Sequence, residues 1–441
     1  MINSITFNIT NSCQLNCRYC FEHSKNGLFL SLDDMKTTLD YLYERSDKSS
    51  VFYVAFFGGE PLLRWNDIKA LITYANEKNY LIEWSFTTNF VYQFTDDDMT
   101  FIEDNNIYIL VSIDGDKDTH DLNRCNSYNS VVSNIERFKK YDLMNRLEGR
   151  ITFTPETVDE LSHNVEHLFN LGFIELGFYP VSDVHWEEEK LKVLVDQVSI
   201  ISDWLIDKYN DIDNTQNIDI RNINENISLF PEMFEKNNVE ENIKTFKCSL
   251  QSIHQVTINP DKTVHACHQE STTDANEFLL GTIDDLLNGK IPLNDISSKL
   301  NLSFLESERV LDDRFGFNCK TCLARKACPG CCPAESFRQT RSFNNVPAVC
   351  CFLAIALAIN KIKILDKLLN AKNVRGKIPV KVQCSLKLYQ SYLNVIKTSS
   401  TNPSAIIEAS RLLEYIKDNS RLILEDYIRV INEGLSYLLG K

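Results

Sequence analysis

The sequence predicts an α/β fold for residues 1–210, because short β-rich segments alternate there with longer amphipathic ones. The expected strands are Ile5–Ile9, Phe52–Phe57, Ile82–Thr87, Ile107–Ser112, Arg150–Thr154 and Ile174–Pro180. The expected helices are Leu32–Tyr43, Ile68–Asn76, Asp96–Glu103, Ser130–Tyr141 and Val158–Leu171. Strands that alternate with helices pair in parallel through right-handed crossovers. We therefore expect six β/α units, open or barrel-like, with functional groups at the carboxyl ends of the strands.

Three regions of different composition follow the α/β part. Residues 211–245 are rich in Asn and Asp and have weak apolar spacing, which is typical of a connecting segment. Residues 246–355 are Cys-rich, since nine of the 14 cysteines lie between Cys248 and Cys351. Residues 356–441 lack a strand pattern and carry apolar residues at helical spacing, so we expect an all-α C-terminal region.

Composition narrows the class of protein. The chain has 46 basic and 61 acidic residues, a net charge of −15, which argues against binding to nucleic acid or to anionic membranes. No secretory signal opens the chain, and the longest apolar run, Ala348–Ile359, has the length of a buried helix rather than of a membrane span. We expect a cytoplasmic protein, in which clustered cysteines hold metal or carry out redox chemistry.

The first cysteine cluster lies where the first expected strand ends. Cys13, Cys17 and Cys20 have the spacing C-x3-C-x2-C. Three thiolates on one short loop can hold three irons of a cubane and leave the fourth iron open to another ligand. The alternative is a structural zinc site, which would need a fourth donor such as His23.

This spacing, with Tyr19 directly before the third cysteine, resembles the radical S-adenosylmethionine (SAM) superfamily. The resemblance extends to Gly58, Gly59 and Glu60, which follow the second expected strand where the superfamily carries its GGE motif. Glycines let a backbone approach a ligand closely. The resemblance implies that the Glu60 carboxylate accepts hydrogen bonds from the SAM amino group.

The carboxyl ends of later strands supply further candidates for SAM binding. By the same resemblance, Ser112, Asp114 and Arg124 face the ribose and the carboxylate of SAM, and the Val181-Ser182 segment contacts the adenine. The implied fold is a partial (β/α)6 TIM-type barrel. The implied chemistry is reductive cleavage of SAM to a 5′-deoxyadenosyl radical, driven by an external one-electron donor of the flavodoxin or ferredoxin type.

The second cysteine cluster has the spacing C-x2-C-x5-C-x3-C over residues 319–332, followed by Cys350 and preceded by Cys248 and Cys267. It resembles the SPASM domain of radical SAM enzymes that act on peptides and proteins, although Lys262 stands where a Gly is usual. Zinc ribbons built from the same cysteine pairs are the alternative. The resemblance implies two auxiliary [4Fe–4S] clusters, and three clusters in all.

The resemblance also assigns the auxiliary ligands. Auxiliary cluster II takes four cysteines, which are Cys319, Cys322, Cys328 and Cys350. Auxiliary cluster I takes three, which are Cys248, Cys267 and Cys332. The usual place of its fourth cysteine holds His254, so His254 or Cys331 completes that cluster, or one iron stays open to a substrate thiolate.

Three functions fit these motifs. The favoured one is a maturase that takes hydrogen from a ribosomally made precursor peptide to install a thioether or a carbon–carbon crosslink. The second is an anaerobic sulfatase maturase, which makes formylglycine and in which an Asp after the second auxiliary Cys acts as base. Here that place holds His268, our candidate catalytic residue. The third, of another class, is an iron–sulfur electron carrier or sensor, which would need no SAM pocket.

Overall fold

The computed structural model describes residues 2–22, 25–211, 217–228, 255–269, 277–300 and 332–370, with short pieces at 310–311, 378–379, 382–383, 385–387 and 389–390. The described chain divides into two compact units. The first unit consists of residues 1–152, 167–173 and 247–306. The second consists of residues 153–166, 174–246 and 307–441.

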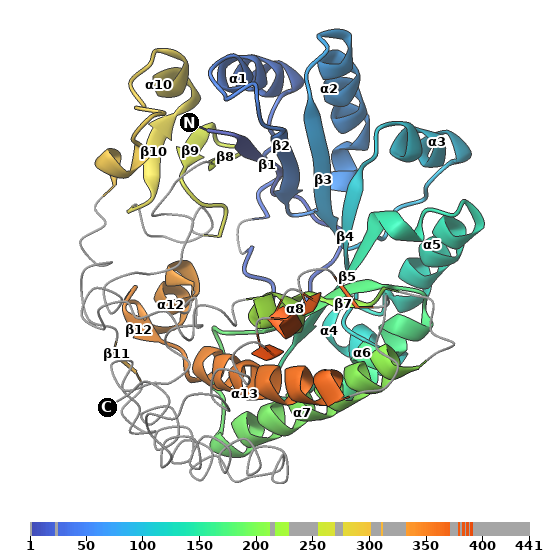
Figure 1. Ribbon diagram of the computed structural model, residues 1–441. Helices are drawn as coiled ribbons and strands as arrows, with labels where there is room; N and C mark the ends of the chain where they lie inside the picture. Colours follow the sequence, from blue (N-terminus) through green and yellow to red (C-terminus); the bar gives the residue numbers. More distant parts are fainter. Residues whose placement is uncertain are drawn as a thin grey trace. The chain divides into compact units, whose positions relative to one another are not determined.

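In the first unit, all five expected strands are present and pair in parallel in sequence order. They are β1 (Ser4–Thr10), β2 (Phe52–Gly58), β3 (Ile82–Thr88), β4 (Tyr108–Ser112) and β5 (Leu147–Phe153). The expected helices are α1 (Leu32–Glu44), α2 (Trp65–Glu77), α3 (Asp96–Asp104) and α5 (Tyr128–Lys140). These helices follow one another along one side of the strands (Figure 1).

Alternate residues of each strand face those helices and form the core. Ile5, Phe7, Val54, Phe56 and Val111 are almost completely buried, as the two-residue period of a strand requires. The side chains between them are smaller or polar on several strands. The register places Thr6 beside Ala55 and Ala55 beside Ser85. The face turned away from the helices therefore carries small and polar side chains together with the aromatic Tyr53 and Phe57 of β2.

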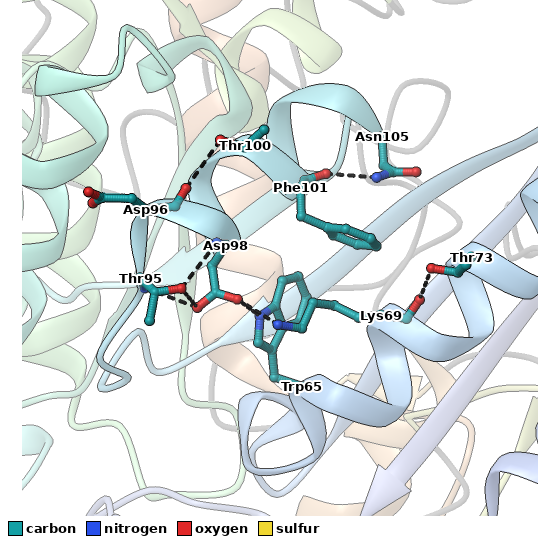
Figure 2. A network of polar contacts seen from close by, with 9 residues as sticks. All are labelled: Trp65, Lys69, Thr73, Thr95, Asp96, Asp98, Thr100, Phe101 and Asn105. Atoms are coloured by element: carbon teal, nitrogen blue, oxygen red, sulfur yellow. Dashed lines mark hydrogen bonds and ion pairs between the residues drawn. The ribbon is translucent and has the colours of Figure 1, made fainter.

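Two helices begin with side-chain caps, and one of the capping residues, Asp98, also joins two neighbouring β/α units. Before α2, a 3-10 helix (Pro61–Arg64) begins at Glu60, whose side chain accepts from the Leu62 amide. Helix α3 begins with a capping box between Thr95 and Asp98. Figure 2 shows that Asp98 also accepts hydrogen bonds from Trp65, at 2.7 Å, and from Lys69, at 2.8 Å. The start of α2, directly after the glycine-rich turn, is thereby fixed to the start of α3.

Three strands extend the sheet beyond β1. Strand β8 (Gln255–Ile258) pairs in parallel with β1, β9 (Thr263–His265) pairs antiparallel with β8, and β10 (Leu279–Thr282) pairs antiparallel with β9. The β8–β9 turn contains Lys262, which takes the left-handed conformation with φ +67° and forms an ion pair with Asp34 at 3.0 Å. The residue that replaces the usual Gly thus keeps a conformation that Gly adopts more easily.

The second unit contains the sixth expected strand and two long helices. Strand β6 (Glu175–Pro180) pairs in parallel with the short β7 (Asp219–Ile220), and α8 (Arg221–Ser228) follows. The segment that we expected to be a plain connection therefore contains a strand and a helix. Helix α13 (Ala348–Asn370) packs along α7 (Glu188–Asn210) (Figure 1). Helix α6 (Leu161–Asn170), also expected from the sequence, has residues in both units.

Helix α13 covers the apolar run noted in the sequence. Among the described residues it is the one helix long and apolar enough to cross a membrane, but 59% of its apolar window is buried inside the protein. Its Lys363 is 2% exposed and donates to Asp203 of α7 at 2.6 Å and to Ser199 at 3.0 Å. These contacts agree with the prediction of a buried helix. The other helices expected in the C-terminal region, Lys381–Ile396 and Ser404–Leu439, lie mostly or wholly outside the described residues.

Candidate active site

The cysteine loop and the glycine-rich turn are joined through their backbones. The Gly59 amide donates to the Thr10 carbonyl at 2.7 Å, and the Glu60 amide donates to the Ser12 carbonyl at 2.9 Å. A Cβ at Gly58 would overlap the Thr10 carbonyl, and one at Gly59 would overlap that of Ser12. Gly58 also has a φ of +114°, which disfavours other residues. Both glycines are therefore required for this close approach, which places Cys13 beside the GGE turn.

Glu60 is buried and already holds three hydrogen bonds. Its Oε1 accepts from the Leu62 amide at 3.0 Å and from the Thr88 hydroxyl at 2.7 Å, and its Oε2 accepts from the Asn89 amide at 2.7 Å. A carboxylate has about four acceptor positions, and these donors occupy three of them. Burial raises the pKa of Glu60 to about 7, against the lowering effect of these donors.

Asp114 organises the cysteine loop from the end of β4. It is completely buried, and its Oδ1 forms an ion pair with the Arg124 Nε at 3.0 Å and accepts a hydrogen bond from the Thr152 amide at 3.1 Å. Its Oδ2 accepts from the Tyr19 hydroxyl, between two of the loop cysteines. Burial raises the pKa of Tyr19, so the phenol stays a donor. Asp114 thus has three protein partners, and its contact with SAM remains a prediction.

Arg124 lies between Asp114 and the cysteines. Its guanidinium carbon is 5.3 Å from the centre of the Tyr19 ring, and its Nη1 is 4.0 Å from the Cys17 sulfur. Burial opposes its charge, but the nearby Asp114 carboxylate raises the pKa of Arg124 above its ordinary value. Ser112 is half-buried at the end of β4, where the register sets it opposite Arg150 of β5.

The three loop cysteines are each half-buried. The Cys13 sulfur accepts a hydrogen bond from the Leu15 backbone amide at 3.4 Å. It also lies 3.6 Å from the side-chain nitrogen, Nδ2, of Asn89. Burial raises the pKa of Cys17 to about 11 and also raises that of Cys13. A bound cation would favour the thiolate forms of Cys13 and Cys17 against this effect of burial.

The donor set fits a cluster rather than a single ion. Within the described residues no three His, Cys, Asp or Glu side chains converge on one metal position. The thiolates of a cubane bind different irons, so they need not converge. Amide and guanidinium donors also lie close to Cys13 and Cys17, and such groups stabilise cluster sulfur.

Two residues outside the predicted ligand and SAM-binding set also lie at this site. Asn89, which directly follows β3, donates to Glu60 through its backbone amide, and its side-chain nitrogen lies 3.6 Å from the Cys13 sulfur. Cys125, which the sequence left unassigned, accepts a hydrogen bond from the Asn16 amide at 3.3 Å. It takes a φ of +57°, and its exposed side chain lies against the cysteine loop.

His268 reaches the glycine-rich turn through aromatic contacts. Its ring centre is 5.2 Å from that of Phe57, the residue before Gly58. Phe57 in turn stacks on Phe21, which follows Cys20, with the ring centres 6.4 Å apart. His268 directly follows Cys267 at the end of β9. The rings of Phe21, Phe57 and His268 thus form a continuous contact between the residue after Cys20 and the residue after Cys267.

The auxiliary ligands are only partly described. In the first unit Cys267 is half-buried after β9, and in the second Cys332 caps α12 (Pro333–Thr340). Cys350 lies in the first turn of α13, with its sulfur 4.0 Å from Glu335 Oε2. The remaining predicted ligands lie outside the described residues, and they are Cys248, Cys319, Cys322 and Cys328. The alternatives His254 and Cys331 lie there too, as does His23.

Residues 7–168 match the family model described as "Radical SAM superfamily". Among curated relatives, the radical SAM cyclopropyl synthase TigE of Paramaledivibacter caminithermalis is 22% identical over 353 residues, which cover 75% of this chain and 68% of TigE. A cysteine-type anaerobic sulfatase-maturating enzyme of Clostridium novyi is 27% identical over 148 residues, 30% of this chain and 39% of that enzyme.

The shared segments are short in several relatives. An uncharacterized protein of Methanocaldococcus jannaschii is 35% identical, but over 83 residues that make up 18% of this chain and 28% of that protein. This chain therefore spans less than half of the length of two of these three relatives.

Solved structures show the same fold. A structure titled anSMEcpe with bound AdoMet matches with a TM-score of 0.64 at 20% identity, covering 88% of this chain and 99% of that one. SuiB of Streptococcus suis matches with a TM-score of 0.54 at 14% identity, covering 79% of this chain and 77% of that one. These matches confirm the expected partial TIM-type barrel. The superfamily consists of enzymes that use SAM, and this chain carries a radical SAM domain.

Proposed function

We propose that this protein is a radical SAM maturase that takes a hydrogen atom from a ribosomally made peptide and installs a thioether or a carbon–carbon crosslink. The observation that carries the SAM chemistry is the pair of backbone hydrogen bonds between the cysteine loop and the glycine-rich turn. They bring three cysteines and the Glu60 carboxylate to one end of neighbouring parallel strands. An electron carrier would not need such a turn.

The residues of the site have separable roles in this proposal. Cys13, Cys17 and Cys20 would hold a [4Fe–4S] cluster, which together with SAM supplies the radical that takes a hydrogen atom from substrate. Glu60 has an acceptor position left for the SAM amino group, and Asp114 holds Tyr19 in place within the cysteine loop.

The peptide substrate rests on the relatives and on the character of the sheet. The structures titled with bound AdoMet and Cp18Cys peptide, and SuiB with its precursor peptide SuiA, share the fold of this chain. The inner face of the sheet carries small and polar side chains such as Thr6, Ala55 and Ser85. A bound polypeptide needs hydrogen-bonding partners, and the hydroxyls of Thr6 and Ser85 are groups of that kind.

His268 is proposed as the group that removes a proton from the substrate after the hydrogen atom has left, and an auxiliary [4Fe–4S] cluster would accept the remaining electron. Its half-buried ring contacts Phe57, one residue before Gly58, so it lies close to the turn that would hold SAM. A His can accept a proton near neutral pH. The second candidate function, formylglycine formation, is favoured by the sulfatase-maturating relatives, but His268 occupies the place of the Asp base of that group.

Two auxiliary [4Fe–4S] clusters in a SPASM domain complete the proposal. Their ligands are the cysteines that the resemblance assigns, and an external flavodoxin- or ferredoxin-type protein would supply the electron for SAM cleavage. An open iron on auxiliary cluster I could bind a peptide thiolate, because a metal lowers the pKa of a thiol.

The test is anaerobic reconstitution of the full chain, followed by SAM, dithionite and a synthetic copy of a short Cys-containing peptide encoded beside this chain. A maturase forms 5′-deoxyadenosine and a peptide that has lost two hydrogens, whereas formylglycine formation exchanges the thiol sulfur for oxygen. Cys17→Ala should abolish SAM cleavage. Its matched control, Cys125→Ala, removes a cysteine that touches the same loop and should leave cleavage intact. No cleavage by the wild type would favour a carrier.

His268→Ala separates the proton acceptor from SAM cleavage. We expect 5′-deoxyadenosine to form while the modified peptide falls by about a hundredfold or more, the lower end of the range for the loss of a general base. A product yield equal to that of the wild type would remove His268 from the mechanism without affecting the assignment of Cys17.

A further inference from the structure

We propose that the side-chain amide of Asn123 binds the iron–sulfur cluster of the cysteine loop, with its Nδ2 donating a hydrogen bond to a cluster sulfur. This inference rests on the proposed function, since it assumes a cluster on Cys13, Cys17 and Cys20. It assigns a new role to a residue that neither the cysteine spacing nor the GGE motif indicates.

The first argument is that Asn123 is buried without a partner. It is the last residue of α4 (Lys117–Asn123) and is 1% exposed. It lies one turn after His120 and Thr119, which are also buried. Within the described residues, neither its Nδ2 nor its Oδ1 has a hydrogen-bond partner. A buried amide without partners costs stability, so such groups in native proteins nearly always have one.

The second argument is the position of Asn123 against the cysteine loop. Its carbonyl oxygen accepts from the Arg18 amide at 3.0 Å. The next residue, Arg124, brings its Nη1 to 4.0 Å from the Cys17 sulfur, and Cys125 accepts from the Asn16 amide. Three consecutive residues thus contact the loop on both sides of Cys17. We infer that a group held by that loop supplies the missing partner.

The third argument is chemical. Cluster sulfurs accept hydrogen bonds, and an amide donor stabilises the reduced cluster, which is more negative, and raises its reduction potential. The neighbouring Arg124 guanidinium would act in the same direction by its charge. Asn123 would therefore make the cluster easier to reduce and fix its orientation against the end of α4.

The experiment compares two buried asparagines under the same change. Asn123→Leu removes the unpartnered amide. Asn134→Leu is the matched control, because Asn134 is 7% exposed and donates to the Phe90 and Tyr92 carbonyls at 2.8 and 2.7 Å. In the cluster-free full chain, we expect Asn123→Leu to raise the melting temperature and Asn134→Leu to lower it. Asn123→Ala serves as a second variant if the larger Leu prevents folding.

The second measurement is made on the reconstituted chain. An EPR redox titration follows the cluster signal that SAM perturbs, and we expect its midpoint potential to become more negative in Asn123→Leu both with and without SAM. A lower melting temperature of the cluster-free variant would overturn the inference, because the amide would then already have a partner. An unchanged midpoint, or a change seen only with SAM, would also overturn it.

These outcomes are distinct from a failure of the proposed function. If the reconstituted wild type shows no SAM-responsive cluster, both proposals are wrong. If it does, and only the Asn123 comparison fails, the proposed function stands and this inference alone is wrong.

Discussion

Replacing Asp98 by Ala should destabilise the first unit strongly, because one carboxylate supports two helices. Asp98 is 1% exposed and accepts from the Trp65 indole at 2.7 Å, the Lys69 ammonium at 2.8 Å and the Thr95 amide at 3.0 Å (Figure 2). Loss of the capping box costs about 1 kcal/mol. A buried indole N–H left without an acceptor adds about 1–3 kcal/mol. We therefore expect a loss of about 3 kcal/mol in the free energy of unfolding.

The assay is urea unfolding of the cluster-free full chain, followed by tryptophan fluorescence and circular dichroism. Asp96→Ala is the matched control, since Asp96 belongs to the same helical turn but its side chain is exposed and pairs with Arg137 at the surface. The control should unfold at the wild-type urea concentration. A loss of less than about 1 kcal/mol for Asp98→Ala, or equal behaviour of the two variants, would refute the role given to this carboxylate.

The same reasoning fixes the pH dependence. Burial opposes ionisation of Asp98, but the donors on Lys69, Thr95 and Trp65 hold its pKa below the ordinary value. A carboxyl whose pKa is depressed on folding contributes stability above its unfolded pKa of about 3.9, and this is lost as the pH falls through the folded pKa. The difference between wild type and Asp98→Ala should therefore shrink below about pH 4.

Three further predictions can be checked independently. Changing Cys13, Cys17 and Cys20 together to Ala should abolish 5′-deoxyadenosine formation while iron for the other clusters remains; cleavage that persists would contradict the ligand assignment. Reconstituted wild-type protein should hold about twelve irons, four in each of three cubanes, whereas about four irons with bound zinc would favour zinc ribbons. Lys262→Gly should leave the free energy of unfolding unchanged or raise it. Relief of the left-handed conformation gains about 1 kcal/mol, and loss of the surface ion pair with Asp34 costs about 0–1 kcal/mol. A clearly lower free energy in urea unfolding would show that the ion pair contributes more than the strain.

The order of strands and helices in the α/β part was predictable because it depends on local patterns. Apolar residues at a period of two, as in Phe52, Val54 and Phe56, define a strand wherever the chain places it. The short helix α4 was missed, since its seven residues are too few to show a helical period. Helix α7 was missed as well, although it is long, and the two-residue strand β7 gave no pattern to detect.

The sequence by itself determined the chemistry of the site, and the tertiary structure determined which residues meet there. The spacing of Cys13, Cys17 and Cys20 and the GGE motif identify a family because both are local, and local spacing survives in a sequence. Contacts between distant segments do not. Asn89 lies against Cys13 because parallel strands bring their carboxyl ends to one edge, and the contacts of Asn123 with Arg18 and of His268 with Phe57 likewise join segments far apart in the chain. No spacing along the chain encodes these distances, so only the folded sheet could reveal them.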